Sequence, residues 1–167
     1  VFLTVIPAYV IGTRHFTQNL VNVYFSLFYI TVCASQFLTG PLSDRKGRRP
    51  LMVAGLLFTA AGMALVPVLP SPWVFGAFAA ISFGLGTFYL SSMAFLNETV
   101  PDSLKGTISG AYFLFWGIGN FAGPPVIGMV VQALGHGPGF AFVAALLALQ
   151  AAAVARKGRA ELGKSLP

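Results

Sequence analysis

Side chains that could carry acid–base, nucleophilic or metal chemistry are few in this chain, and they lie far apart. Its 167 residues include two histidines, one cysteine and four acidic residues. An enzyme would need paired acids, histidines and cysteines at metal-ligand spacing, or a nucleophile beside a base. His15 and His136 are separated by most of the chain, and Cys33 stands alone. We therefore expect a protein that is not an enzyme and has no cofactor, metal site or internal disulfide.

The composition indicates that the chain lies in a membrane. Apolar residues make up 56% of it and charged residues only 8%, whereas ordinary globular domains carry about 25% charge. Its 19 glycines and 11 prolines are tolerated better in lipid-embedded helices than in soluble ones. We expect an all-α membrane protein with six transmembrane helices, one for each apolar segment. The segments cover residues 1–12, 20–39, 51–69, 73–96, 107–131 and 140–155, and a polar tail covers 156–167.

The first segment is short for a membrane span. As a helix it would rise about 18 Å, less than the roughly 30 Å hydrocarbon core of a bilayer. We therefore expect a truncated first helix in a chain that is a fragment of something longer.

Basic residues are distributed unequally between the connections that join these segments. The connections after segments one, three and five hold only Arg14, and the other side holds Arg45, Lys46, Arg48, Arg49, Lys105, Arg156, Lys157, Arg159 and Lys164. Lysine and arginine favour the cytoplasmic side of a membrane. We therefore expect a multi-pass protein of the plasma membrane whose second, fourth and sixth segments end in the cytoplasm. Because these residues occupy short gaps between apolar runs, the net charge of +6 indicates topology and not nucleic-acid binding.

Polar side chains form stripes on three segments. They recur every three or four residues, which places them on one helix face. The stripes are Asn22, Ser26, Tyr29, Cys33 and Gln36 on the second segment, Ser82, Tyr89 and Ser92 on the fourth, and Ser109, Tyr112, Trp116 and Asn120 on the fifth. Two interpretations stay open, namely packing between helices and the lining of a cavity. Our candidates for cavity lining are Tyr89, Tyr112, Trp116 and Asn120.

The third and sixth segments are much less polar. Apart from glycine, the third carries only Thr59 as a polar residue and the sixth carries only Gln150. Two runs of three segments, each ending in an apolar one, are the pattern expected of an inverted repeat around a central pathway.

Residues 40–50 form a charged loop between two apolar segments, with the sequence G-P-L-S-D-R-K-G-R-R-P. We expect Gly40 and Pro41 to end the second segment, and Gly47 to permit a tight turn. Asp44 could cap a helix N-terminus, or it could pair with Arg45, Arg48 or Arg49.

This loop resembles the signature loop of major facilitator superfamily transporters, G-x-L-[SA]-D-[RK]-x-G-R-[RK], which joins the second and third helices of a six-helix half. The resemblance implies that the chain is one half of a major-facilitator-type bundle. It also implies a conformational latch between the two halves at the cytoplasmic side, carried here by Gly40, Asp44, Arg45, Gly47, Arg48 and Arg49.

A second stretch, residues 119–128, lies inside the fifth segment. Gly119 and Gly123 offer a small face for close packing, and Pro124 and Pro125 should kink the helix. The stretch is similar to the Gly-Pro motif in the fifth helix of antiporters of the superfamily, with one extra residue before Gly128. Comparable Gly-Pro kinks also occur in the eleventh helix of many members.

The fourth segment distinguishes the two halves of the family. N-terminal halves typically carry an arginine there, whereas residues 79–84 of this chain have none. We therefore favour the C-terminal half, with an N-terminal six-helix half missing.

The resemblance implies secondary active transport of a small organic solute by alternating access, coupled to a proton or another ion. We prefer drug-type efflux, and the alternative is an uptake symporter for a sugar or organic acid. A non-transporting scaffold or sensor on the same fold is a further alternative.

Glu98 is the acid closest to the membrane interior, and we expect it at a helix end, facing Lys105. A coupling site would then belong to the missing half.

Overall fold

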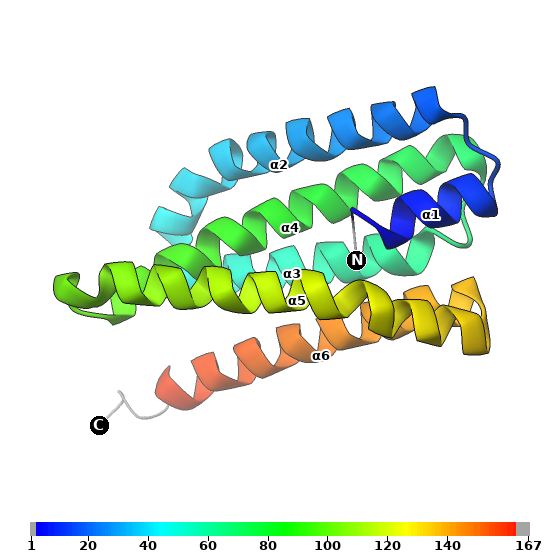
Figure 1. The fold of residues 1–167 in the computed structure, drawn as a ribbon. Coiled ribbons are helices and arrows are strands. Elements are labelled where there is room, and N and C mark those ends of the chain that lie inside the picture. Colours follow the sequence, from blue (N-terminus) through cyan, green and yellow to red (C-terminus); the bar gives the residue numbers. More distant parts are fainter. Residues whose placement is uncertain (1–2, 163–167) are drawn as a thin grey trace.

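The computed structural model describes residues 3–162, with side chains through Arg156. These residues form six α-helices and one short 3₁₀ helix (Figure 1). In chain order they are α1 (Val5–Gly12), α2 (Gln18–Lys46), α3 (Arg48–Leu65), α4 (Ser71–Thr99), η1 (Asp102–Leu104), α5 (Lys105–Leu134) and α6 (His136–Leu162).

Four stretches are long and apolar enough to cross a membrane. They are α2, α4, η1 together with α5, and α6 as far as Arg156. Helix α1 has only eight residues, and α3 begins with two arginines, so neither is among the four in the described part of the chain. The prediction of an all-helical membrane protein is confirmed, whereas crossing by six helices stays a prediction.

Several helices extend beyond the predicted apolar segments. Helix α2 continues through Gly40 and Pro41 to Lys46, so the expectation that this pair ends the helix was wrong. One proline removes one backbone hydrogen bond, and the helix continues because its neighbouring backbone bonds remain. The chain turns instead at Gly47, whose φ of +88° strains any residue with a side chain. Helix α6 enters the predicted tail, of which residues 163–167 lie outside the described residues.

The closest helix pair is α3 and α4, and glycines bring their backbones together. A Cβ atom built on Gly84 would lie 2.5 Å from the carbonyl oxygen of Gly55, and one built on Gly62 would lie 2.6 Å from Ile81. The hydroxyl of Thr59 crosses the interface and donates to the Ile81 carbonyl at 3.5 Å. Small residues at such positions are how helices associate in lipid.

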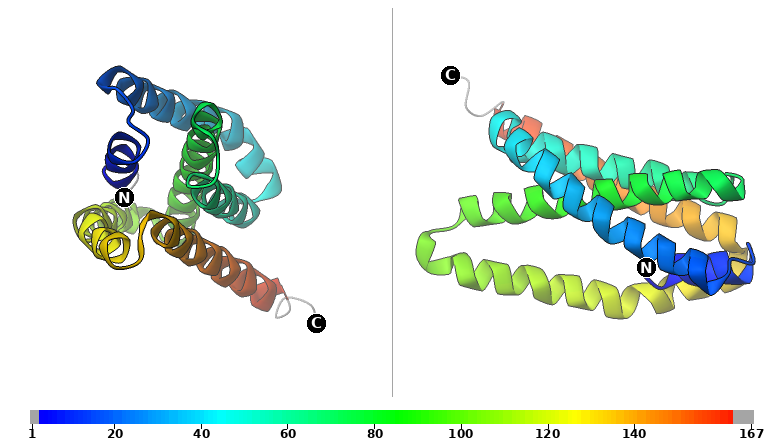
Figure 2. Two further views of the ribbon diagram at one scale, coloured as in Figure 1. Left: turned by 90° about the vertical axis from the view of Figure 1, so that its right-hand side faces the viewer. Right: turned by 90° about the horizontal axis from the view of Figure 1, so that it is seen from above.

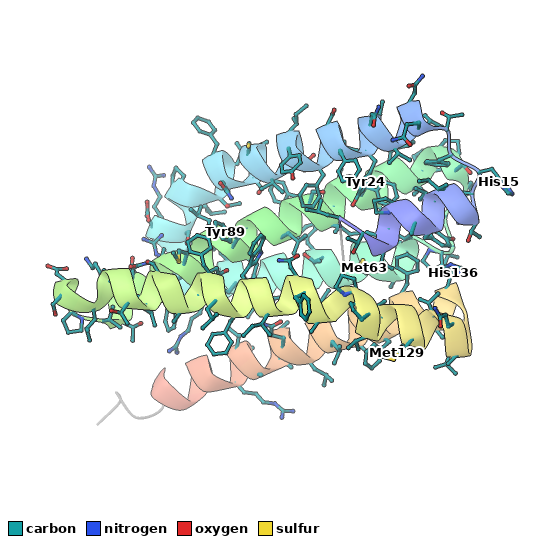
Figure 3. All side chains as sticks on the ribbon, in the orientation of Figure 1. His15, Tyr24, Met63, Tyr89, Met129 and His136 are labelled. Atoms are coloured by element: carbon teal, nitrogen blue, oxygen red, sulfur yellow. The ribbon has the colours of Figure 1, made fainter. Side chains whose placement is uncertain are left out.

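Helix α4 lies at the centre of the bundle and also packs against α2 and α5 (Figure 2). At one end of the α2–α4 contact, the buried hydroxyls of Ser43 and Ser91 lie 3.2 Å apart. At the other end, the Tyr24 ring meets the Phe78 ring edge-on, with centroids 4.7 Å apart (Figure 3). These contacts make α2, α3 and α4 one continuous unit.

The two ends of the bundle differ in charge. The α2–α3 and α4–α5 connections and the end of α6 lie at the left of Figure 1, and the other connections lie at the right. The left end therefore carries Arg45, Lys46, Arg48, Arg49, Lys105 and Arg156. At the opposite end, the guanidinium of Arg14 donates to the Tyr9 hydroxyl at 3.2 Å and to the Pro67 carbonyl at 3.1 Å, which ties α1 to the end of α3.

Adding one methyl group at the α3–α4 crossing should destabilise the fold. We predict that Gly84→Ala lowers the free energy of unfolding by about 1–3 kcal/mol, the usual cost of overpacking a tight core. Gly76→Ala on the same helix is the control, because a Cβ there meets nothing within 4 Å. It should stabilise the helix by about 0.5–1 kcal/mol. Thermal unfolding in detergent measures both variants, and a neutral Gly84→Ala would contradict the tight crossing.

Candidate functional site

A pocket of about 620 Å³ lies between α2, α4 and α5. Its volume falls within the range of small-molecule sites in proteins. The walls consist of Leu3, then Phe28, Tyr29, Val32 and Gln36 of α2, Leu85, Gly86, Phe88 and Tyr89 of α4, Tyr112, Phe113, Trp116, Gly119 and Asn120 of α5, and Gln150 of α6.

Two tyrosines from different helices meet in the pocket wall. Tyr89 projects from α4 (Figure 3), and its ring lies edge-on to that of Tyr112, with centroids 5.7 Å apart. The Tyr112 hydroxyl is 3.0 Å from the hydroxyl of Ser92. The pair therefore joins α4 to α5 and presents aromatic surface to the pocket at the same place.

The structure brings all four cavity-lining candidates, Tyr89, Tyr112, Trp116 and Asn120, into this one pocket. The polar stripe of α2 is divided, because Tyr29 and Gln36 line the pocket whereas the other three members do not. On α4, Ser82 is buried and donates to the Phe78 carbonyl at 2.7 Å, which is a packing role. The stripes thus serve both packing and lining, and contact with a solute stays a prediction.

Gln150 is a lining residue that the sequence interpretation missed. It lies on α6, whose predicted segment is otherwise apolar, and it lines the pocket together with residues of α5. A lone amide in a long apolar helix is itself a signal, since polar groups in lipid-embedded helices are costly unless they have a partner or a function.

The pocket is mostly apolar, and its polar groups are uncharged. Among the described residues that line it, none carries a formal charge at neutral pH, and the polar side-chain groups are tyrosine hydroxyls, the Trp116 indole N–H and the amides of Gln36, Asn120 and Gln150. Such a surface can stack on aromatic rings and form neutral hydrogen bonds.

The glycine–proline stretch of α5 lies beside this pocket. Helix α5 runs unbroken through Pro124 and Pro125, and it changes direction in its yellow part in the right-hand view of Figure 2. Gly119 lines the pocket, and a Cβ built on it meets nothing within 4 Å. Close packing at Gly119 would therefore need a partner outside the described residues.

The signature loop forms an ion-pair network centred on Arg48. Its guanidinium pairs with Asp44 one turn earlier, and it donates from Nε at 3.0 Å and from Nη2 at 2.6 Å to Oε1 of Glu98. The network joins the end of α2, the start of α3 and the last turn of α4. Beside it, the guanidinium of Arg49 lies over the Phe95 ring, 5.0 Å from the centroid.

Glu98 does not face Lys105 as the sequence interpretation expected. Lys105 pairs instead with Asp102, at 2.7 Å. The reason is local, because the η1 turn brings Lys105 back toward the residue three positions before it, and Glu98 is left facing the start of α3.

The network also affects the titration of Arg48. Hydrogen bonding to Glu98 first, and then to Asp44, raises the pKa of the guanidinium above its ordinary value and outweighs the effect of partial burial. The ion pairs thus favour the charged form that an arginine already has at neutral pH.

The fold and pocket define a multi-pass helical membrane protein with a cavity of solute size. Comparison with known families agrees, because residues 1–164 match the Major Facilitator Superfamily. The chain belongs to this superfamily, as its signature loop predicted.

Several curated relatives are transporters by name. The chain is 28% identical over 131 residues to the uncharacterized MFS-type transporter YfnC of Bacillus subtilis (78% of this chain, 32% of the relative). It is 34% identical over 137 residues to multidrug resistance protein fnx1 of Schizosaccharomyces pombe (80% and 25%). It is 33% identical over 96 residues to the gentisate transporter of Corynebacterium glutamicum (57% and 20%). The chain thus spans about a third or less of these relatives. No solved structure matches it.

The contact between Arg48 and Glu98 predicts an energetic coupling between α3 and α4. In a double-mutant cycle of Arg48→Gln and Glu98→Gln, we expect a coupling energy of about 0.2–1 kcal/mol at low ionic strength, because Glu98 is half exposed to solvent screening. The coupling should shrink in high salt. Thermal unfolding in detergent measures it.

The control for this cycle replaces Glu98→Gln with Asp102→Asn, whose carboxylate pairs with Lys105. Arg48→Gln and Asp102→Asn should be additive. Full additivity of Arg48→Gln with Glu98→Gln would mean that the ion pair contributes nothing.

Proposed function

We propose that the protein is a secondary active transporter that carries a small organic solute across a membrane by alternating access. The observation that supports it most is the uncharged, aromatic pocket between α2, α4 and α5 in a chain of the Major Facilitator Superfamily. Binding sites near the middle of the membrane, between two helical repeats, are the general arrangement of such transporters.

The proposed solute is aromatic or amphipathic, and the proposed direction is efflux. Tyr89, Tyr112 and Trp116 offer ring faces, and Asn120 offers an amide. Multidrug resistance proteins are among the relatives of the chain, which supports the preference for efflux over uptake. The driving ion would bind in the other half, because the described lining of this half contains no carboxylate or base.

The proposed whole protein has twelve helices, of which this chain supplies the C-terminal six. Its α1 and α3 would complete six membrane crossings, and the end that carries the Arg48 network would face the cytoplasm. The sign of the charge asymmetry supports this orientation. Much of α5 is exposed in the described chain, including Phe113, Trp116 and Phe121, and this surface is available to an N-terminal half.

The signature loop is proposed as a latch that favours one state of the transport cycle. Within this half, Arg48 already holds the ends of α2, α3 and α4 together through Asp44 and Glu98. A rigid end of this kind can move as one body against the other half. Gly40, Arg45, Gly47 and Arg49 belong to the same proposed latch.

Solute flux tests the proposed transport. The full-length protein in proteoliposomes, with an imposed proton gradient, should move at least one neutral aromatic solute. Trp116→Ala should lower that flux by about tenfold or more, because aromatic anchors contribute a large share of binding energy. Phe115→Ala is the matched control, since Phe115 is exposed on the same helix but does not line the pocket. If no solute moves under any gradient, the scaffold interpretation replaces transport.

Removal of the Asp44 charge tests the latch. We expect Asp44→Asn to lower the flux by up to about fivefold, because an exposed ion pair contributes about 0.2–1 kcal/mol, while expression and membrane insertion stay normal. Asp102→Asn is the control, because its partner Lys105 lies outside the loop. Equal flux in wild type and Asp44→Asn would remove the latch role.

A further inference from the structure

Pro124 changes what the pocket wall offers at Asn120. In an α-helix the amide N–H of residue i+4 donates to the carbonyl oxygen of residue i. Proline has no amide hydrogen, so the main-chain carbonyl of Asn120 loses its helical donor inside α5. Pro125 frees the main-chain carbonyl of Phe121 in the same way.

The side chain of Asn120 presents a second acceptor at the same position. Its Nδ2 donates to the Trp116 carbonyl at 3.0 Å, which holds the amide against its own helix. No described residue donates to its Oδ1. One residue thus carries a main-chain acceptor without its i+4 donor and a side-chain oxygen without a donor from the described residues.

The wall around these acceptors is open. Asn120 is exposed and lines the pocket together with Gly119, whose missing side chain leaves the backbone uncovered. Gly123, one turn further along, has no side chain that could cover the Asn120 carbonyl. Phe121 does not line the pocket, so only one of the two carbonyls freed by proline belongs to a lining residue.

We propose that the two acceptor oxygens of Asn120 recognise a hydrogen-bond donor on an otherwise apolar aromatic solute, such as an aryl amine, an anilide N–H or a phenol. A bound solute displaces water from these acceptor oxygens, and binding loses free energy if the solute offers no donor in its place. The acceptors therefore select for solutes that carry a donor. Because no lining residue is charged, the donor is part of a neutral group. The inference rests on the proposed function, since it places the solute in this pocket.

Three related fluorescent probes separate the contributions to recognition. N-phenyl-1-naphthylamine is neutral and has one N–H donor, and its N-methyl derivative is neutral without a donor. The sulfonated analogue 8-anilino-1-naphthalenesulfonate keeps the N–H and adds a negative charge. For the full-length protein in proteoliposomes, we expect the affinity for N-phenyl-1-naphthylamine to exceed that for the N-methyl derivative by about fivefold, the effect of one net hydrogen bond. The sulfonated probe should bind more weakly than the neutral donor probe.

Two variants and two matched controls assign this preference to Asn120. Asn120→Leu removes the side-chain oxygen, and Pro124→Ala restores a backbone donor to the Asn120 carbonyl. Each should reduce the preference for the N–H probe to about twofold or less, because each removes one of the two acceptors. Pro125→Ala relaxes the same kink but restores the donor to Phe121, and Asn22→Leu removes an amide that accepts from Gln18 and does not line the pocket. Both controls should keep the wild-type preference.

The outcomes distinguish this inference from the proposed function. Loss of the preference in Asn120→Leu and Pro124→Ala, with retention in the two controls, supports the donor site. Transport of N-phenyl-1-naphthylamine with no preference over its N-methyl derivative overturns the donor site and leaves transport standing. Equal effects of Pro124→Ala and Pro125→Ala also overturn it, because they assign the effect to the kink alone. Failure of the protein to bind or move any probe overturns both.

Discussion

The backbone contact between α3 and α4 is the constraint on which the rest of the bundle depends. In lipid there is no hydrophobic driving force for helices to associate, so close packing of small residues must hold them together. Gly55 and Gly84 bring the two backbones so near that neither position has room for a methyl group. The Arg48–Glu98 ion pair joins the same two helices at their charged end, and the Ser43–Ser91 contact adds α2. These three helices form the frame against which every other element is placed.

Helix α5 makes fewer contacts with these three helices, and this leaves room for the pocket between them. Its described polar contacts with α4 are Tyr112 with Ser92 and, more weakly, Ser109 with Asn97 at 3.5 Å. The middle of α5 exposes most of its side chains. A helix held at a few points beside a closely packed frame leaves space between them, and aromatic and amide side chains from both sides line that space. In transporters generally, elements with few buried contacts are those that move.

Hydropathy and charge placement were enough to predict the all-helical membrane fold, and the loop around Asp44 was enough to predict the superfamily. The helical period placed four candidate residues on faces that the structure brings into one pocket, because side chains four residues apart must share a helix face. Pairings between distant residues were not predictable. The contact of Arg48 with Glu98 and the arrival of Gln150 at the pocket depend on how helices cross, which no local pattern contains. The passage of α2 through Pro41 was missed because a proline removes only one backbone hydrogen bond, which a long helix can lose without ending.

Protection of an introduced cysteine by solute would test most directly whether the pocket is the solute site. In a Cys33→Ser background, Phe113→Cys places a thiol in the pocket wall, and Phe115→Cys places one on the same helix outside the pocket. We expect a transported solute to slow alkylation of Phe113→Cys by about fivefold or more, as occupancy by a bound ligand requires, and to leave Phe115→Cys unchanged. Equal slowing at both positions, or no slowing at Phe113→Cys, would contradict a solute site between α2, α4 and α5.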